Sequence, residues 1–81
     1  MKIQVNGRIH EGEPIDIVRE MKSYAFGGDS IELSDFVNST AQATLENIES
    51  VMNATDSHEV ACTALLNAMI AEGVANLLDE G

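Results

Sequence analysis

Residues 2–12, KIQVNGRIHEG, decide the fold class, because they predict β-structure in a chain whose remaining pattern is helical. Asn6-Gly7 is a strong signal for a tight hairpin turn, since both residue types readily adopt the positive φ angles that such turns require. The alternating residues on either side are typical of two short strands. A β-hairpin is therefore predicted over residues 1–12.

Two registers of this hairpin differ in which side chains share a face. A two-residue turn pairs Val5 with Arg8 and places Ile9 on the opposite face from Ile3. A three-residue loop with Gly7 in the left-handed conformation pairs Ile3 with Ile9 instead. We expect the second register, because it keeps the apolar side chains on one face.

A first helix is predicted over residues 14–26. Pro14 suits the first position of a helix, because its fixed φ angle is already helical and its missing N–H has no partner there. Gly27-Gly28 provides the stop. The apolar face of this helix comprises Ile17, Val18, Met21, Tyr24 and Ala25.

A second helix is predicted over residues 30–52, where apolar side chains recur at intervals of three and four. Asp29 followed by Glu32 resembles a capping box at its start. The opposite, polar face carries the carboxylates of Glu32, Asp35, Glu46 and Glu49. The expected buried face comprises Leu33, Phe36, Val37, Thr40, Ala41, Thr44, Leu45, Ile48, Val51 and Met52.

A third helix is predicted over residues 56–72, with a similar capping pattern in Asp56 and Glu59. Gly73 is a natural stop, and Val74–Leu78 is expected to form a short final turn. The three predicted helices and the hairpin form a single domain, residues 1–81. The expected fold class is α+β, mainly α, with the N-terminal β-hairpin packed on a three-helix core.

The composition favours a small intracellular domain. With 81 residues the chain buries a limited core. The single cysteine, Cys62, has no internal disulfide partner, whereas small secreted domains usually have several disulfides. No signal-peptide pattern opens the chain, and no apolar run approaches the roughly 18 residues that span a membrane. We therefore expect a cytoplasmic protein that does not associate with a membrane.

Charge is distributed unevenly along the chain. Residues 1–22 contain four Lys or Arg and four acids, whereas residues 23–81 contain ten acids and no Lys or Arg. The net charge of −10 therefore lies in the second segment. Direct binding to nucleic acid is disfavoured, because contacts with phosphates require cations.

The four carboxylates of the predicted second helix suggest a binding function. Glu32, Asp35, Glu46 and Glu49 would form an acidic strip that a helix selected only for stability would interrupt with Lys. A strip of this kind fits a partner protein with a basic surface, because complementary charge speeds encounter and fixes register. The alternative is a solvated face that keeps the protein soluble.

Two large aliphatic residues of the third helix fall on its polar side. Leu66 and Ile70 share that side with Glu59, so we expect them to be exposed and to form an apolar patch. Such a patch predicts a homodimer or another partner contact. The alternative is that the hairpin or the final turn folds back over both residues.

The string HEVAC, residues 58–62, contains the most chemically suggestive pair. His58 and Cys62 are four residues apart and could share a metal ion or form a base and a nucleophile. A zinc site needs further ligands, and a thiol enzyme needs a cleft and an oxyanion hole. We expect Cys62 to be a buried structural residue, with no metal, cofactor or catalytic residue in the protein.

Residues 1–22, MKIQVNGRIHEGEPIDIVREMK, and residues 64–81, ALLNAMIAEGVANLLDEG, resemble the ends of short bacterial or mobile-element proteins without assigned function. In size and acidity the chain is also similar to phage-borne anti-CRISPR proteins, several of which cover a basic surface that would otherwise hold nucleic acid. This resemblance implies a non-enzymatic inhibitor as the leading function. A homodimeric assembly protein is the second hypothesis, and a metal or thiol protein using His58 and Cys62 is the third.

Overall fold

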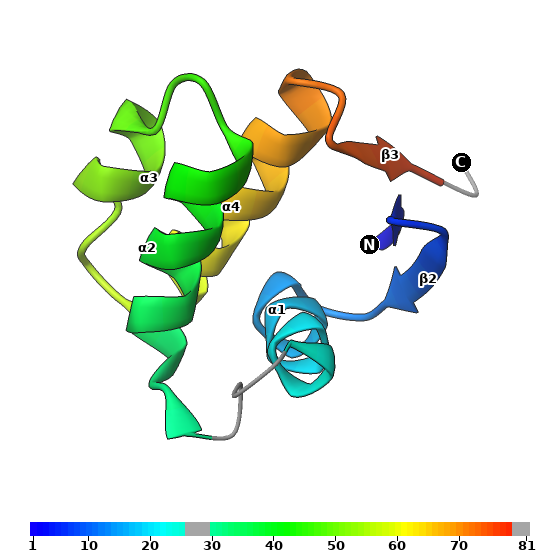
Figure 1. The fold of residues 1–81 in the computed structure, drawn as a ribbon, viewed down its shortest axis with the longest axis horizontal. Coiled ribbons are helices and arrows are strands. Elements are labelled where there is room, and N and C mark those ends of the chain that lie inside the picture. The colour runs from blue at the N-terminus through cyan, green and yellow to red at the C-terminus, as the bar shows by residue number, and fades with distance from the viewer. Residues whose placement is uncertain (26–29, 79–81) are drawn as a thin grey trace.

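The computed structural model describes residues 1–25 and 30–78, and it shows an α+β fold (Figure 1). The predicted fold class and the N-terminal hairpin are thereby confirmed. In chain order, the elements of the described residues are β1 (Lys2–Val5), β2 (Arg8–Glu11), α1 (Pro14–Tyr24), α2 (Leu33–Thr44), α3 (Glu49–Asn53), α4 (His58–Ala71) and β3 (Ala75–Leu77).

The hairpin adopts the register that we did not expect. Val5 pairs with Arg8 and Ile3 pairs with His10, so Ile9 lies on the outer face and is 58% exposed. The turn decides this register, because Asn6 and its glycine neighbour both have positive φ angles, 52° and 80°. A two-residue turn of this type matches the twist of the strands, and that geometry outweighs the burial of one isoleucine.

The predicted final turn at Val74–Leu78 is instead a third strand. β3 pairs antiparallel with β1, which gives the strand order β2-β1-β3. Gly73 has a φ of 79° and directs the chain back toward the sheet, while the N–H of Val74 donates to the carbonyl of Met69 at 2.8 Å. The free edge of β1 explains the difference, because unpaired strand edges readily accept another strand.

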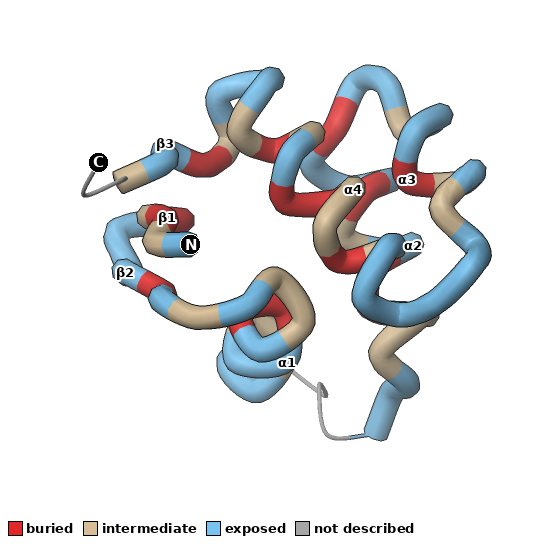
Figure 2. Tube along the Cα trace, turned by 180° about the vertical axis from the view of Figure 1, so that it is seen from behind, coloured by how far each residue is buried: buried red, intermediate tan, exposed pale blue. Residues whose placement is uncertain are grey.

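Helix α4 occupies the middle of the fold and packs against α1, α2, α3 and β3 (Figures 1 and 2). Its fully buried side chains, those of Cys62, Leu65, Leu66 and Met69, follow the i, i+3, i+4, i+7 spacing of one helix face. The prediction that Leu66 is exposed is wrong: it is 0% exposed, because the buried face is centred near Cys62 and Leu66, whereas Val60 is 43% exposed. Ile70 is partly buried and packs against the same core.

The predicted second helix, residues 30–52, is two helices. The helical conformation ends at Leu45, whose φ of −108° and ψ of 142° are extended, and it resumes at Glu49. Side-chain acceptors replace the lost helical hydrogen bonds. The Glu72 carboxylate accepts the N–H groups of Glu46 at 2.7 Å and Asn47 at 3.1 Å. The three-helix core is consequently a core of four helices.

The other helix ends differ from the predictions by one to three residues, and the largest difference is the start of α2 at Leu33 instead of residue 30. Helix α1 ends at Tyr24, and the predicted end at residue 26 lies outside the described residues. The same is true of Gly27-Gly28 and of the predicted cap Asp29. Helix α4 begins at His58 with Ser57 as its cap, whose hydroxyl accepts the N–H of Val60 at 3.1 Å. Asp56 is therefore not the cap.

The hydrophobic core lies between the inner face of the sheet and the helices (Figure 2). His10 is the buried polar residue among those described, at 3% exposed. Within residues 1–25 and 30–78, every helix is too short or too polar to cross a lipid bilayer. The largest fully buried side chains are Ile3, Ile17, Leu65, Leu66, Met69, Val18, Val37 and Cys62.

Candidate ligand-binding groove

The four carboxylates of the predicted strip lie on three segments. Glu32 is the N-cap residue of α2 and Asp35 lies in its first turn, whereas Glu46 lies in the following connection and Glu49 begins α3. All four are exposed. The prediction of one strip along a single helix is wrong, because the helix ends at Thr44.

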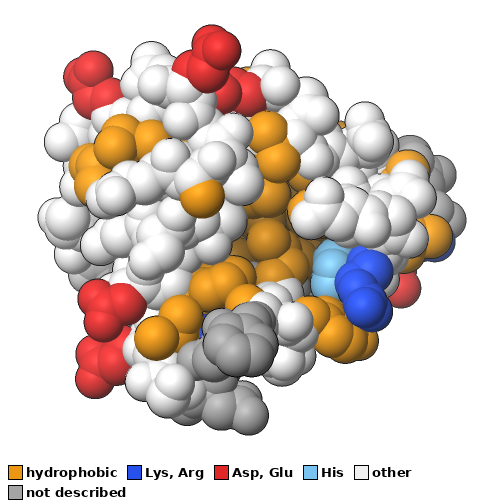
Figure 3. All heavy atoms as spheres, viewed as in Figure 1, with side chains coloured by type: hydrophobic (Ala, Val, Ile, Leu, Met, Phe, Trp, Pro, Cys, Tyr) orange, Lys and Arg blue, Asp and Glu red, His pale blue; other side chains and the backbone are white. Residues whose placement is uncertain are grey.

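Acidic groups nevertheless dominate the exterior of α2, α3 and α4. Residues 30–78 contain no Lys or Arg, and every carboxylate among them is exposed. In Figure 3 the acidic side chains lie near the margins of the visible face. We call these seven groups the acidic helical surface: Glu32, Asp35, Glu46, Glu49, Asp56, Glu59 and Glu72.

The predicted apolar patch is not formed as expected. Leu66 belongs to the core, and Ile70 is only partly accessible. The segment after α4 does fold back, as strand β3, and α4 contacts β3. Leu66 is therefore unable to form the predicted homodimer contact.

His58 and Cys62 lie in different environments. His58 is exposed at the first position of α4, whereas Cys62 is fully buried in the core. Burial raises the pKa of the Cys62 thiol above its usual 9.0, and the positive charge of Arg19 opposes this shift. Among the described residues, no group of three His, Cys, Asp or Glu side chains could hold a metal ion.

A groove of about 340 Å³ opens between the hairpin, α1, α2 and the end of α4. It appears in Figure 3 as a hollow with a hydrophobic floor, bordered on one side by a histidine and a cationic side chain. This volume lies at the lower end of the range of about 300–1,000 Å³ that small-molecule sites occupy. Its apolar lining comprises Val5, Met21, Ala25, Phe36, Met69 and Val74.

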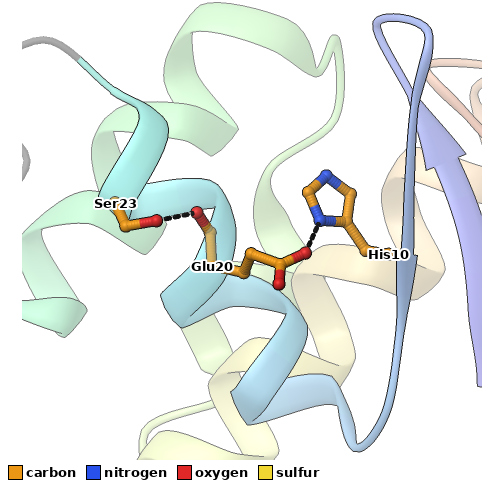
Figure 4. Close-up of polar contacts among 3 residues, drawn as sticks. All are labelled: His10, Glu20 and Ser23. Carbon is orange, nitrogen blue, oxygen red and sulfur yellow. Dashed lines mark hydrogen bonds and ion pairs between the residues drawn. The ribbon is translucent and has the colours of Figure 1, made fainter.

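His10 supplies a buried polar group to this groove. Its Nδ1 donates to Oε1 of Glu20 on α1 at 2.5 Å, and the second ring nitrogen points away from Glu20 (Figure 4). Glu20 is half-exposed, and the Ser23 hydroxyl donates to its backbone carbonyl at 2.6 Å. Because an ionised carboxylate only accepts, Nδ1 carries a proton, and the hydrogen bond fixes the ring orientation.

Arg8 supplies the positive charge at the mouth. Its guanidinium carbon lies 4.1 Å from the centre of the Tyr24 ring, a cation–π contact. The same ring lies 6.2 Å from that of His10, centre to centre. Arg8 and His10 face the groove together, because the two-residue turn places both on the inner face of β2.

We did not expect Arg8, His10 and Tyr24 to lie together at one site. The signal that could have found them was Asn6-Gly7, since a strict two-residue turn puts residues 8 and 10 on the same face as Ile3. Comparisons with protein-family models, with curated proteins and with solved structures gave no match for this chain.

Proposed function

We propose that the protein is a non-enzymatic binding module of the cytoplasm. It presents the acidic helical surface to the basic, nucleic-acid-binding surface of a partner protein and inhibits that partner. The observation that carries this proposal is the exposure of seven carboxylates on α2, α3, α4 and their connections, with no Lys or Arg in the same segment. The anti-CRISPR-like character of the sequence and an origin in a phage or mobile element belong to the same proposal.

Physical chemistry supports this use of the surface. Carboxylates close together repel one another, so the arrangement slightly disfavours the isolated fold. A partner with clustered Lys and Arg relieves that repulsion and gains complementary charge. The seven carboxylates lie on three helices and the connections next to them. The acidic helical surface therefore suits a broad basic channel better than a narrow slot for one helix.

The test begins with capture of a partner from bacterial lysate on immobilised protein at low ionic strength. We expect a basic nucleic-acid-binding protein to be retained and to elute as added salt screens the charges. Two double variants then locate the contact: Glu32→Gln with Asp35→Asn, and Glu46→Gln with Glu49→Gln. At least one should slow association several-fold.

The matched control is Glu11→Gln with Glu13→Gln, which removes two charges from exposed positions on and just after β2. This variant should associate at the wild-type rate. Equal effects from all three double variants would show that only net charge matters. Retention that salt does not weaken would contradict the proposal.

A further inference from the structure

The groove has a polar pattern that an apolar docking surface would lack. Its floor is hydrophobic, but Arg8 stands at the mouth and His10 forms part of the wall. Among the described residues no carboxylate forms an ion pair with Arg8. Stacking on Tyr24 occupies one face of the guanidinium and leaves its N–H edge free to bind an anion.

His10 presents an unsatisfied nitrogen to the same space. The residue is 3% exposed, and Nδ1 is used by Glu20. Among the described residues, none forms a hydrogen bond with Nε2 of His10. Every fully buried side-chain nitrogen or oxygen of the described residues has a hydrogen-bond partner. Nε2 is therefore accessible, and the lining of the groove includes His10. With the proton on Nδ1, an unprotonated Nε2 accepts a hydrogen bond.

We infer that this groove binds a medium-chain hydroxy acid: an apolar chain that carries one carboxylate and one hydroxyl near the same end. The chain covers the floor formed by Phe36, Met69 and Val74, the carboxylate accepts from Arg8, and the hydroxyl donates to Nε2 of His10. Residues 8 and 10 are two positions apart on one strand, about 7 Å, which suits a carboxylate and a hydroxyl separated by one methylene group, together with a long arginine.

An anion meets less repulsion here than elsewhere on the acidic protein, because the four Lys or Arg of residues 1–22 balance the four acids of that segment. All four Lys and Arg lie in residues 1–22, which form the hairpin and most of α1, two walls of the groove. The Glu20 carboxylate is bound to Nδ1 of His10, and the second ring nitrogen points away from it. The acidic helical surface is a separate region, so this inference does not depend on the proposed function.

Three probes on the wild-type protein test the inference without any substitution. Calorimetry with 3-hydroxydecanoate, decanoate and decanol, all below micelle formation, should give the tightest binding for the first and the weakest for the last. Loss of the carboxylate should weaken binding roughly tenfold, since charge-assisted hydrogen bonds are the stronger kind. Loss of the hydroxyl should weaken it roughly threefold.

Two matched variants assign the charge contact. Arg8→Gln should weaken binding of both acids roughly tenfold and leave decanol unchanged. Arg19→Gln, on an exposed position of α1 outside the groove, removes the same charge and should leave all three affinities unchanged. Backbone amide shifts in NMR spectra should concentrate at β2, the end of α1 and the start of α2.

Several results would overturn the inference. They are absence of saturable binding by both acids, equal affinity for decanol and the acids, or amide shifts confined to the acidic helical surface. An unchanged affinity in Arg8→Gln would do the same. For the hydroxyl contact, His10→Phe should abolish the preference for 3-hydroxydecanoate over decanoate. If that variant does not fold, the wild-type comparison of these two probes decides the point alone.

Discussion

The chemical role of Cys62 depends on its surroundings in the fold. Four residues after His58 it resembles a metal ligand or nucleophile, but its side chain is enclosed by the core while His58 is exposed. Burial raises the pKa of the thiol, so the reactive thiolate is disfavoured in the folded protein. These properties are those of a small apolar core residue.

Cys62→Ala should lower the free energy of unfolding by about 1 kcal/mol at neutral pH, because a small buried group is lost. A pKa that folding raises means that the folded state holds the proton more tightly. The thiol's contribution is therefore fully present below its unfolded pKa, near 9.0, and is lost as pH rises above that value. Wild type should lose stability above this pH more steeply than Cys62→Ala.

Urea denaturation of both proteins between neutral pH and pH 10.5 measures this difference. The two proteins differ only at residue 62, so the comparison isolates the thiol. Parallel pH profiles would show that Cys62 ionises in the folded state as easily as in the unfolded state.

At the scale of elements, Glu72 connects three helices. It follows α4 directly, and its carboxylate accepts two backbone N–H groups from the connection between α2 and α3. Glu72→Ala removes both acceptors at once. We expect a loss of about 1–3 kcal/mol in local stability, since hydrogen bonds to charged groups contribute at that level.

Amide hydrogen exchange measures this effect, because local opening exposes particular N–H groups. Exchange should accelerate at Glu46, Asn47 and through α3, with little change in β1. Asp56→Ala is the matched control, since Asp56 is an exposed acid and makes no described cap to α4. Uniform acceleration in both variants would contradict a specific role for Glu72.

The same connection shows why the helix boundaries could not be fully predicted. Apolar spacing continues from Leu45 to Ile48 as it would in an unbroken helix. The break is stabilised by the carboxylate of Glu72, which is distant in sequence, and by the side chain of Asn47. Leu66 is a similar case: α4 is apolar on nearly every side, so periodicity could not indicate which sides are covered. The hairpin and three helical regions were predictable because Asn6-Gly7 and the apolar spacing are local signals.

The residues of the candidate groove were harder to predict from the sequence than the helices and the hairpin. Arg8 and His10 belong to β2, Tyr24 and Glu20 to α1, and Phe36 to α2, so the groove exists only through tertiary packing. One local error also concealed it, because the three-residue loop that we expected would have changed the faces of β2. The exposure of the acids was predictable from their hydrophilicity, but their distribution over three segments was not.

At the scale of the whole molecule, the net charge of −10 produces self-repulsion that the four cations of residues 1–22 do not offset locally. Raising the ionic strength from 0.01 to 0.15 M shortens the Debye length from about 30 to about 8 Å. The free energy of unfolding should therefore rise with sodium chloride in this range. Urea denaturation at the two salt concentrations measures the change.

A matched pair of variants locates the repulsion. The salt dependence should be smaller in Glu32→Gln with Asp35→Asn than in wild type, and nearly unchanged in Glu11→Gln with Glu13→Gln, whose carboxylates have cations nearby in sequence. Stability that falls with added salt would mean that attractive ion pairs, rather than repulsion, dominate the surface.

The pairing of β1 with β3 also governs when the protein can assemble on the ribosome. About 70 residues separate Val5 from Ala75, and at about 5–20 residues per second their emergence is separated by roughly 4–14 s. During that interval the nascent chain has only the two-stranded hairpin, which is marginally stable in water. Strand β1 thus emerges well before its partner β3, and a message cut short before the codon for Ala75 yields a product in which this pairing cannot form.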